Sequence, residues 1–151
     1  MDILRTLARN QRKFHYCLLT GTVSVYDADG NATGETQSVY SEAVELNANI
    51  SQATGYAQQE QFGQLDGYDK VIVFADPDTP IEESSVLFID KEPEFRAETI
   101  YTMVDSDGEN GETISTLTET EIQIPIFDYT VRRVARSLNS VSIAAAKVKI
   151  S

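Results

Sequence analysis

Residues 71–89 read VIVFADPDTPIEESSVLFI and contain two short apolar runs, 71–75 and 86–89, which a proline-containing segment separates. Short runs that are rich in β-branched residues and bounded by proline are typical of strands buried on both faces. A strand of this kind lies inside a core rather than on its surface. The two runs therefore predict the centre of a β-structured core.

The segments on both sides of this core have the pattern of β-hairpins. Aromatic and β-branched residues dominate 14–26, and a similar run at 38–46 follows a turn segment rich in Asp, Asn and Gly. Strand-like runs at 99–104 and 113–124 flank a second turn-rich segment. We therefore expect a long first hairpin and a second, acidic hairpin over about 97–124.

The two ends of the chain carry different patterns. Residues 129–150 fit a helical stripe, but they also alternate, and their many β-branched residues favour two antiparallel strands joined by a turn at 138–140. Residues 2–12 have apolar side chains at helical spacing with arginines on the other face, which predicts a short basic helix or arm within 1–13. The predicted fold is mainly β: a small barrel or sandwich of antiparallel strands, in a single domain over 1–151.

A long loop over about 47–67 is the first functional candidate. Long loops without a core of their own are unusual in compact domains and are often functional. The stretch 52–64 is nearly uncharged and rich in amides. Its candidate residues are Gln58, Gln59, Gln61, Phe62 and Gln64.

Charge is distributed unevenly along the chain. The 151 residues hold 24 acids and 12 bases, a net charge of −12. Residues 1–13 have a net charge of +3, residues 131–151 of +5, and the acidic middle, 14–130, of −20. A negative surface of this size repels DNA phosphates over about 8 Å at physiological salt, which disfavours conventional DNA binding but not passive enclosure of DNA.

Residues suited to catalysis or metal binding are scarce. The single histidine, His15, lies in a predicted strand, and Cys17 lies in an apolar run where a buried thiol is expected. The turns at 27–31 and 105–108 resemble calcium loops, but their spacing departs from the EF-hand pattern, which favours hairpin turns. We expect no enzymatic activity, no metal and no cofactor.

Several short segments follow one another in an order that is typical of one protein family. They are 26–35, 46–51 with Gly55, 62–63, 68–72, 80–81, 87–90, 128–131 and 134–140. In this order they resemble the head-closure proteins of long-tailed bacteriophages, also called stopper or head-tail connector proteins. Residues 97–124 read as an insertion relative to the family pattern.

This resemblance implies a β-barrel subunit that forms a homo-oligomeric ring in the virion neck. The ring would lie between a portal or adaptor protein on the head side and a tail protein, and would enclose double-stranded DNA without sequence-specific binding. The loop at 47–67 matches the position of the family's channel gate. The cationic ends would contact acidic surfaces of neighbouring copies; the candidate interface charges are Arg5, Arg9, Arg12, Arg132, Arg133 and Arg136.

The remaining expectations concern location and alternative functions. The sequence shows no secretory signal and no membrane span, so we expect synthesis in a cytoplasm and no membrane partner. The resemblance implies that this is the cytoplasm of the bacterial host. One alternative is a neighbouring neck or tail-completion protein. Another is a soluble β-domain that binds a protein partner or Ca²⁺.

Overall fold

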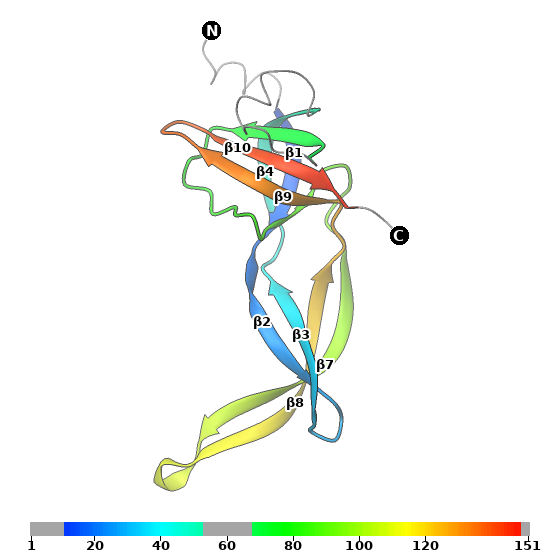
Figure 1. Ribbon diagram of the computed structural model, residues 1–151, viewed down its shortest axis with the longest axis vertical. Helices are drawn as coiled ribbons and strands as arrows, with labels where there is room; N and C mark the ends of the chain where they lie inside the picture. The colour runs from blue at the N-terminus through cyan, green and yellow to red at the C-terminus, as the bar shows by residue number, and fades with distance from the viewer. Residues whose placement is uncertain (1–10, 53–67, 149–151) are drawn as a thin grey trace. The chain divides into compact units, whose positions relative to one another are not determined.

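The computed structural model describes residues 11–52 and 68–148, which form strands β1 to β10 and one short 3₁₀ turn, η1 (Glu109–Gly111) (Figure 1). The chain divides into two compact units, each described here by itself. Unit 1 comprises Met1–Leu18, Glu42–Glu94 and Phe127–Ser151, and unit 2 comprises Leu19–Ser41 and Phe95–Ile126. The predicted mainly β class is confirmed.

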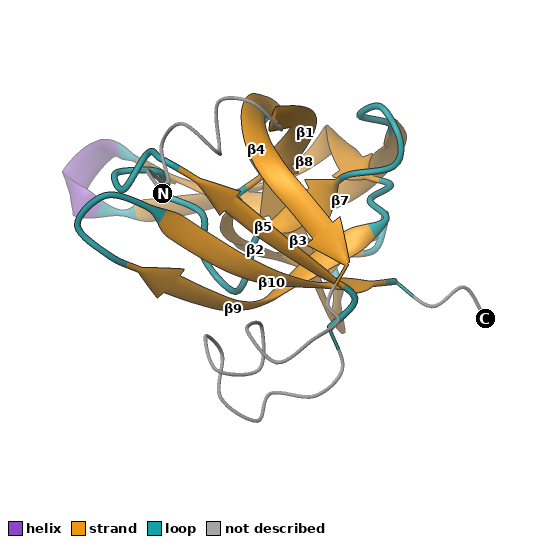
Figure 2. Cartoon of the chain, turned by 90° about the horizontal axis from the view of Figure 1, so that it is seen from above, coloured by secondary structure: helices purple, strands orange, loops and turns teal. Residues whose placement is uncertain are grey.

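In unit 1 the described residues form a closed barrel of six antiparallel strands, in the order β1-β4-β5-β10-β9-β6. Figure 2 shows β4, β5, β10 and β9 side by side in this order. The barrel alternative of the fold prediction is thus confirmed for this unit. The strands are β1 (Gln11–Cys17), β4 (Val44–Gln52), β5 (Lys70–Phe74), β6 (Val86–Phe88), β9 (Tyr129–Arg136) and β10 (Val141–Lys147).

The two apolar runs form the centre of the barrel core, as predicted. All three residues of β6 are buried, and so are four of the five in β5. Ile72, Phe74 and Leu87 are at most 2% exposed. The rings of Phe14 and Phe74 pack with their centroids 6.3 Å apart and tilted by 44°, a favourable aromatic geometry.

The prediction of a loop over 47–67 is wrong for its first residues, 47–52, which form part of strand β4. Residues 47–52 belong to β4, which pairs with β1 on one side and β5 on the other. Leu46, Ala48 and Ile50 face the core, whereas the polar residues between them point outward. This alternation is a strand pattern that the amide-rich composition obscured. Residues 53–67 lie outside the described residues.

Two predictions for the ends of the chain have different outcomes. The predicted pair of C-terminal strands is confirmed by β9 and β10, which are antiparallel and joined across 137–140. The predicted N-terminal helix is not supported: Gln11 and Arg12 lie in strand β1, where they pair with Asn49 and Ala48. Closing the barrel between β4 and β6 requires an extended chain here. Residues 1–10 lie outside the described residues.

In unit 2 the described residues form one four-stranded sheet in the order β3-β2-β7-β8. The two long strands β7 and β8 pair along their whole length, which confirms the second predicted hairpin. The first predicted hairpin is confirmed by the pairing of β2 with β3. The strands are β2 (Leu19–Tyr26), β3 (Ala32–Tyr40), β7 (Phe95–Asp107) and β8 (Thr113–Pro125).

Residues 27–31, whose spacing resembles that of a calcium loop, form the turn between β2 and β3. Gly30 has φ +86°, a left-handed conformation that favours glycine, and its N–H donates to the Asp27 carbonyl. The Asp27 carboxylate accepts hydrogen bonds from the backbone N–H groups of Asp29 and Asn31. The bond from Asn31 is the main reason that the pKa of Asp27 is lowered. The carboxylate therefore stabilises a hairpin turn.

Candidate functional site

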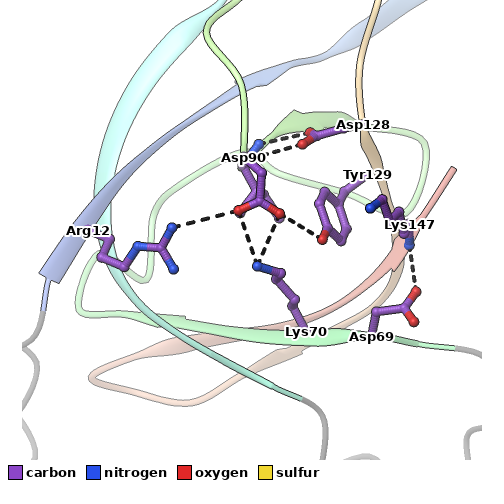
Figure 3. Close-up of polar contacts among 8 residues, drawn as sticks. Arg12, Asp69, Lys70, Asp90, Asp128, Tyr129 and Lys147 are labelled. Atoms are coloured by element: carbon purple, nitrogen blue, oxygen red, sulfur yellow. Dashed lines mark hydrogen bonds and ion pairs between the residues drawn. The ribbon is translucent and has the colours of Figure 1, made fainter.

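A cluster of polar side chains lies at one end of the barrel, where β1, β5 and β9 begin and β6 and β10 end (Figure 3). We call this cluster the barrel-end network. Antiparallel pairing brings these strand ends together although they are far apart in the sequence. The members of the network are Arg12, Lys70, Asp90, Asp128 and Tyr129.

Asp90 is the centre of the barrel-end network. Its carboxylate accepts hydrogen bonds from the Tyr129 hydroxyl at 2.9 Å and from the Lys70 ammonium at 3.2 Å. The Arg12 guanidinium lies 3.7 Å from the same carboxylate. The Lys70 side chain is only 10% exposed, and its ammonium also lies 5.5 Å from the centre of the Tyr129 ring. Lys70 is thus a nearly buried cation with two favourable neighbours.

Two more aspartates connect the strand ends through backbone groups. The Asp128 carboxylate accepts hydrogen bonds from the N–H groups of Ile89 and Asp90, both at 2.9 Å. The Asp69 carboxylate accepts one from the Lys147 N–H at 2.7 Å. Each carboxylate satisfies backbone donors at a strand end or just beyond it, where the ladder of strand hydrogen bonds stops.

The electrostatics of the network favour a neutral tyrosine beside an ionised aspartate. Burial would by itself raise the pKa of Asp90, but hydrogen bonds from Tyr129 and Lys70 and the charges of Lys70 and Arg12 lower it overall. Burial, followed by the hydrogen bond to Asp90, raises the pKa of Tyr129. At neutral pH the Tyr129 hydroxyl therefore stays protonated and donates to Asp90. The network joins β1, β5, β9 and the segment after β6.

The ionised Asp90 carboxylate stabilises the barrel, and we expect this contribution to be lost in acid. Because its pKa is lower in the folded chain than in the unfolded chain, its contribution is complete above the ordinary aspartate pKa of about 4. The contribution is lost as the pH falls through the lower pKa of the folded state. We expect the stability difference between the wild type and Asp90→Asn to shrink between pH 6 and pH 3 in urea unfolding followed by circular dichroism.

A control for this pH series is Glu83→Gln, which neutralises an exposed carboxylate of the same unit. Its stability difference from the wild type should stay near zero at both pH values, since isolated surface changes have small effects. A difference for Asp90→Asn that is the same at pH 6 and pH 3 would contradict the role given to the Asp90 charge.

Arg136 holds a loop onto the barrel. Its guanidinium donates to the carbonyl of Pro77 at 3.0 Å, of Thr79 at 2.7 Å and of Ile81 at 2.8 Å. These carbonyls belong to the loop between β5 and β6, so the side chain links that loop to the end of β9. Its planar fork of N–H donors suits several acceptors at once. The predicted interface residue Arg136 thus has a structural use within its own chain.

Arg136→Ala should reduce the stability of the barrel by about 1–2 kcal/mol, because three charge-assisted hydrogen bonds are lost at a partly exposed site. Arg132→Ala is a matched control on the same strand and should change stability by less than about 0.5 kcal/mol. Urea unfolding of both variants measures the difference. Equal effects would show that the carbonyl contacts of Arg136 do not stabilise the loop.

The other predicted interface arginines lie in different places. Arg132 and Arg133 are both exposed on β9, where the register with β10 shifts between Ala144 and Ala145. This bulge places two consecutive arginines at the surface, although successive strand residues normally alternate between faces. Arg12 belongs to the barrel-end network, whereas Arg5 and Arg9 lie outside the described residues. The candidate gate residues Gln58, Gln59, Gln61, Phe62 and Gln64 also lie outside them.

Unit 2 contains a concave surface that we call the hairpin groove. It is a hollow of about 690 Å³ over β2, β3, β7 and β8. The exposed Val104 lies on it, and the Asp105 carboxylate on it accepts a 2.6 Å hydrogen bond from the Ser115 hydroxyl. The groove is thus mainly apolar, and its lining also includes one carboxylate and the hydroxyl groups of serine and threonine side chains. Its apolar lining is Val23, Tyr26, Val39, Ile100, Met103, Val104 and Ile122.

Cys17 and His15, whose side chains are of types used in catalysis, both lie in strand β1. Cys17 is fully buried, as expected, and burial raises the pKa of its thiol to about 11. One imidazole nitrogen of His15 lies 3.8 Å from the Glu45 carboxylate. Among residues 11–52 and 68–148, no three His, Cys, Asp or Glu side chains are arranged to hold a metal ion.

Neither the barrel-end network nor the hairpin groove follows from the sequence predictions. One signal of the network was available: Lys70 and Asp90 directly adjoin the two buried apolar runs, so their charges had to be paired near the core. The signal for the groove is weaker, because polar and apolar residues alternate only partly along 99–104. Neither signal identifies which distant residue is the partner.

Comparisons of the chain with protein-family models, with curated proteins and with solved structures found no significant match. In the part of the chain that the structure describes, no helix is long and apolar enough to span a membrane.

Proposed function

We propose that the chain is a structural subunit of the neck of a long-tailed bacteriophage. Copies would form a ring between the portal or adaptor protein and the tail, and would close the DNA channel after packaging. The observation that carries this proposal is the barrel-end network. It joins side chains from three of the segments that resemble head-closure proteins, 68–72, 87–90 and 128–131. Segments of a shared fold would be expected to meet in this way.

The placement of the cations supports assembly into a ring. Unit 2 holds ten acidic residues and one basic residue, a net charge of −9, whereas unit 1 holds fourteen acids and eleven bases, a net charge of −3. Nearly all cations therefore belong to the barrel unit. Unlike surfaces on neighbouring copies attract one another in a heterologous contact, which closes into a ring when the rotation allows it.

The acidic character of the chain suits a channel that DNA passes through. Each lysine or arginine that contacts a phosphate adds to non-specific affinity and must be released for DNA to move. A wall with few free cations would enclose DNA and let it slide. The amide-rich segment at 53–67 remains the proposed gate, and the proposed role needs no enzymatic activity or cofactor.

Binding to phage heads tests this proposal. The purified chain would be mixed with DNA-filled, tail-less heads of a phage whose genome encodes it, and examined by light scattering and negative-stain microscopy. We expect rings, and density for the chain at the portal vertex. A chain that stays monomeric and never binds heads would overturn the proposal. Binding to tails alone would instead favour a tail-completion protein.

A further inference from the structure

The hairpin groove has the properties of a docking surface. Val104 is 50% exposed on it, and Ile114, near the tip of the same hairpin, is 48% exposed. Large aliphatic side chains at this exposure, beside a hollow of about 690 Å³, leave apolar surface in water. Burial of that surface by an apolar segment would be favourable.

The charge of unit 2 restricts the kind of segment that fits. The single base of unit 2, Arg96, is paired with Glu98 at 2.8 Å, so it neutralises none of the other nine acids. Asp105 lines the groove, and Asp107 lies on the same strand beyond it. An occupant should therefore combine apolar side chains with positive charge, because a neutral apolar segment would leave the carboxylates unmatched.

One segment of this chain has that composition. Residues 1–10 read MDILRTLARN, with apolar residues at 3, 4, 7 and 8, with Arg5 and Arg9 directly after the two apolar pairs, and with Asp2 as the one acid. We propose that residues 1–10 of one copy bind in the hairpin groove of a second copy, with the apolar side chains on the groove and the arginines beside Asp105. This contact rests on the proposed ring assembly, in which it would join neighbouring copies.

The length of the segment allows contact between copies. Ten extended residues span at most about 35 Å, and the segment is continuous with β1 at Gln11. Because the segment and the groove are different surfaces, each copy offers one of each. When each copy binds a different neighbour the contact is heterologous, and repetition of it generates a ring or an open chain of subunits.

A disulfide trap between full-length chains tests this contact. One variant would carry Arg5→Cys and the other Asp105→Cys. The native Cys17 is fully buried, so it should not compete for oxidation. Mixing an isotope-labelled Arg5→Cys chain with an unlabelled Asp105→Cys chain under mild oxidation should give a covalent heterodimer, which mass spectrometry identifies.

The matched control replaces Asp105→Cys by Glu35→Cys, an exposed acid on β3 of the same sheet that does not line the groove. We expect the heterodimer to form at least tenfold faster with Asp105→Cys than with Glu35→Cys. Equal rates would overturn the proposal. So would a disulfide that closes only within a chain carrying both Arg5→Cys and Asp105→Cys and never between two chains that carry one of these substitutions each.

Self-association gives an independent measurement of the same contact. Val104→Lys places a cation on the groove, whereas Val44→Lys makes the same change at a 42% exposed valine of the barrel. In sedimentation velocity, Val104→Lys should weaken self-association at least tenfold, and Val44→Lys should change it less than twofold. Equal effects of the two variants, or a wild type that does not self-associate, would overturn the inference.

The two proposals can fail separately in these experiments. Rings that bind heads but give no selective Arg5–Asp105 disulfide would exclude the groove contact and leave the neck function standing. A selective disulfide in a chain that never binds heads would support the contact and exclude the neck function.

Discussion

Phe74→Ala is expected to lower the free energy of unfolding of the barrel by about 3–5 kcal/mol. Phe74 is 2% exposed and packs against Phe14 in the core that the closed sheet surrounds. The change removes most of a ring and leaves a cavity, because the strands around it are held in a closed ladder and cannot move inward freely. Urea unfolding followed by circular dichroism measures the loss.

Two further variants separate the cavity effect from a general effect of substitution. Phe74→Leu keeps most of the apolar volume and should cost much less than Phe74→Ala. Leu138→Ala truncates a side chain that is 92% exposed, so it should change stability by less than about 0.5 kcal/mol. If Phe74→Ala cost no more than Leu138→Ala, Phe74 would not belong to a packed core.

Asp128→Ala is expected to destabilise the barrel by about 2–4 kcal/mol. The change removes the acceptor for two backbone N–H groups, those of Ile89 and Asp90. Hydrogen bonds to a charged group contribute about 1.5–3 kcal/mol each, and part of this is recovered from water at the more exposed Asp90 N–H. The segment after β6 should also be held less tightly, because the hydrogen bond from Tyr129 to Asp90 would be its remaining side-chain link to β9. Hydrogen exchange of the Ile89 and Asp90 amides, measured by NMR, reports on this attachment directly.

The matched controls for Asp128 test the acceptor role. Asp128→Asn keeps one acceptor oxygen and should lose about half as much stability as Asp128→Ala. Glu83→Ala removes an exposed carboxylate in the same unit and should have almost no effect on stability or on the two amides. Unchanged protection of the Ile89 amide in Asp128→Ala would contradict the assignment.

The strands could be predicted where the pattern of side chains repeats within a few residues. The runs 71–75 and 86–89 predict buried strands, and the hairpins and the final strand pair follow from turn residues between alternating runs. The prediction is wrong at 47–52, because Asn and Ser, which are typical of loops, occupy the outward positions of a strand there. The alternation of Leu46, Ala48 and Ile50 was present but was outweighed by composition.

The barrel-end network could not be predicted from local pattern. Lys70 and Asp90 are 20 residues apart, and Tyr129 is 39 residues from Asp90. Which strand ends meet depends on the order in which strands pair around the closed barrel. Here β5 neighbours β10, and β6 neighbours β1 and β9. The alternation of side chains along a strand is the same whichever strands lie beside it. It therefore does not reveal the order of the strands around the barrel.

The net charge of −12 is a property of composition, and its division into cationic ends and an acidic middle can be read along the chain. Pairing of β2 with β7 determines something different: it gathers 19–41 and 95–126 into one sheet with a net charge of −9 and an apolar hollow. Strand alternation and turn residues are short-range and can be read from the chain. The joining of distant strands, and so the groove, depends on closing long loops, which is favourable only when the complete sheets form.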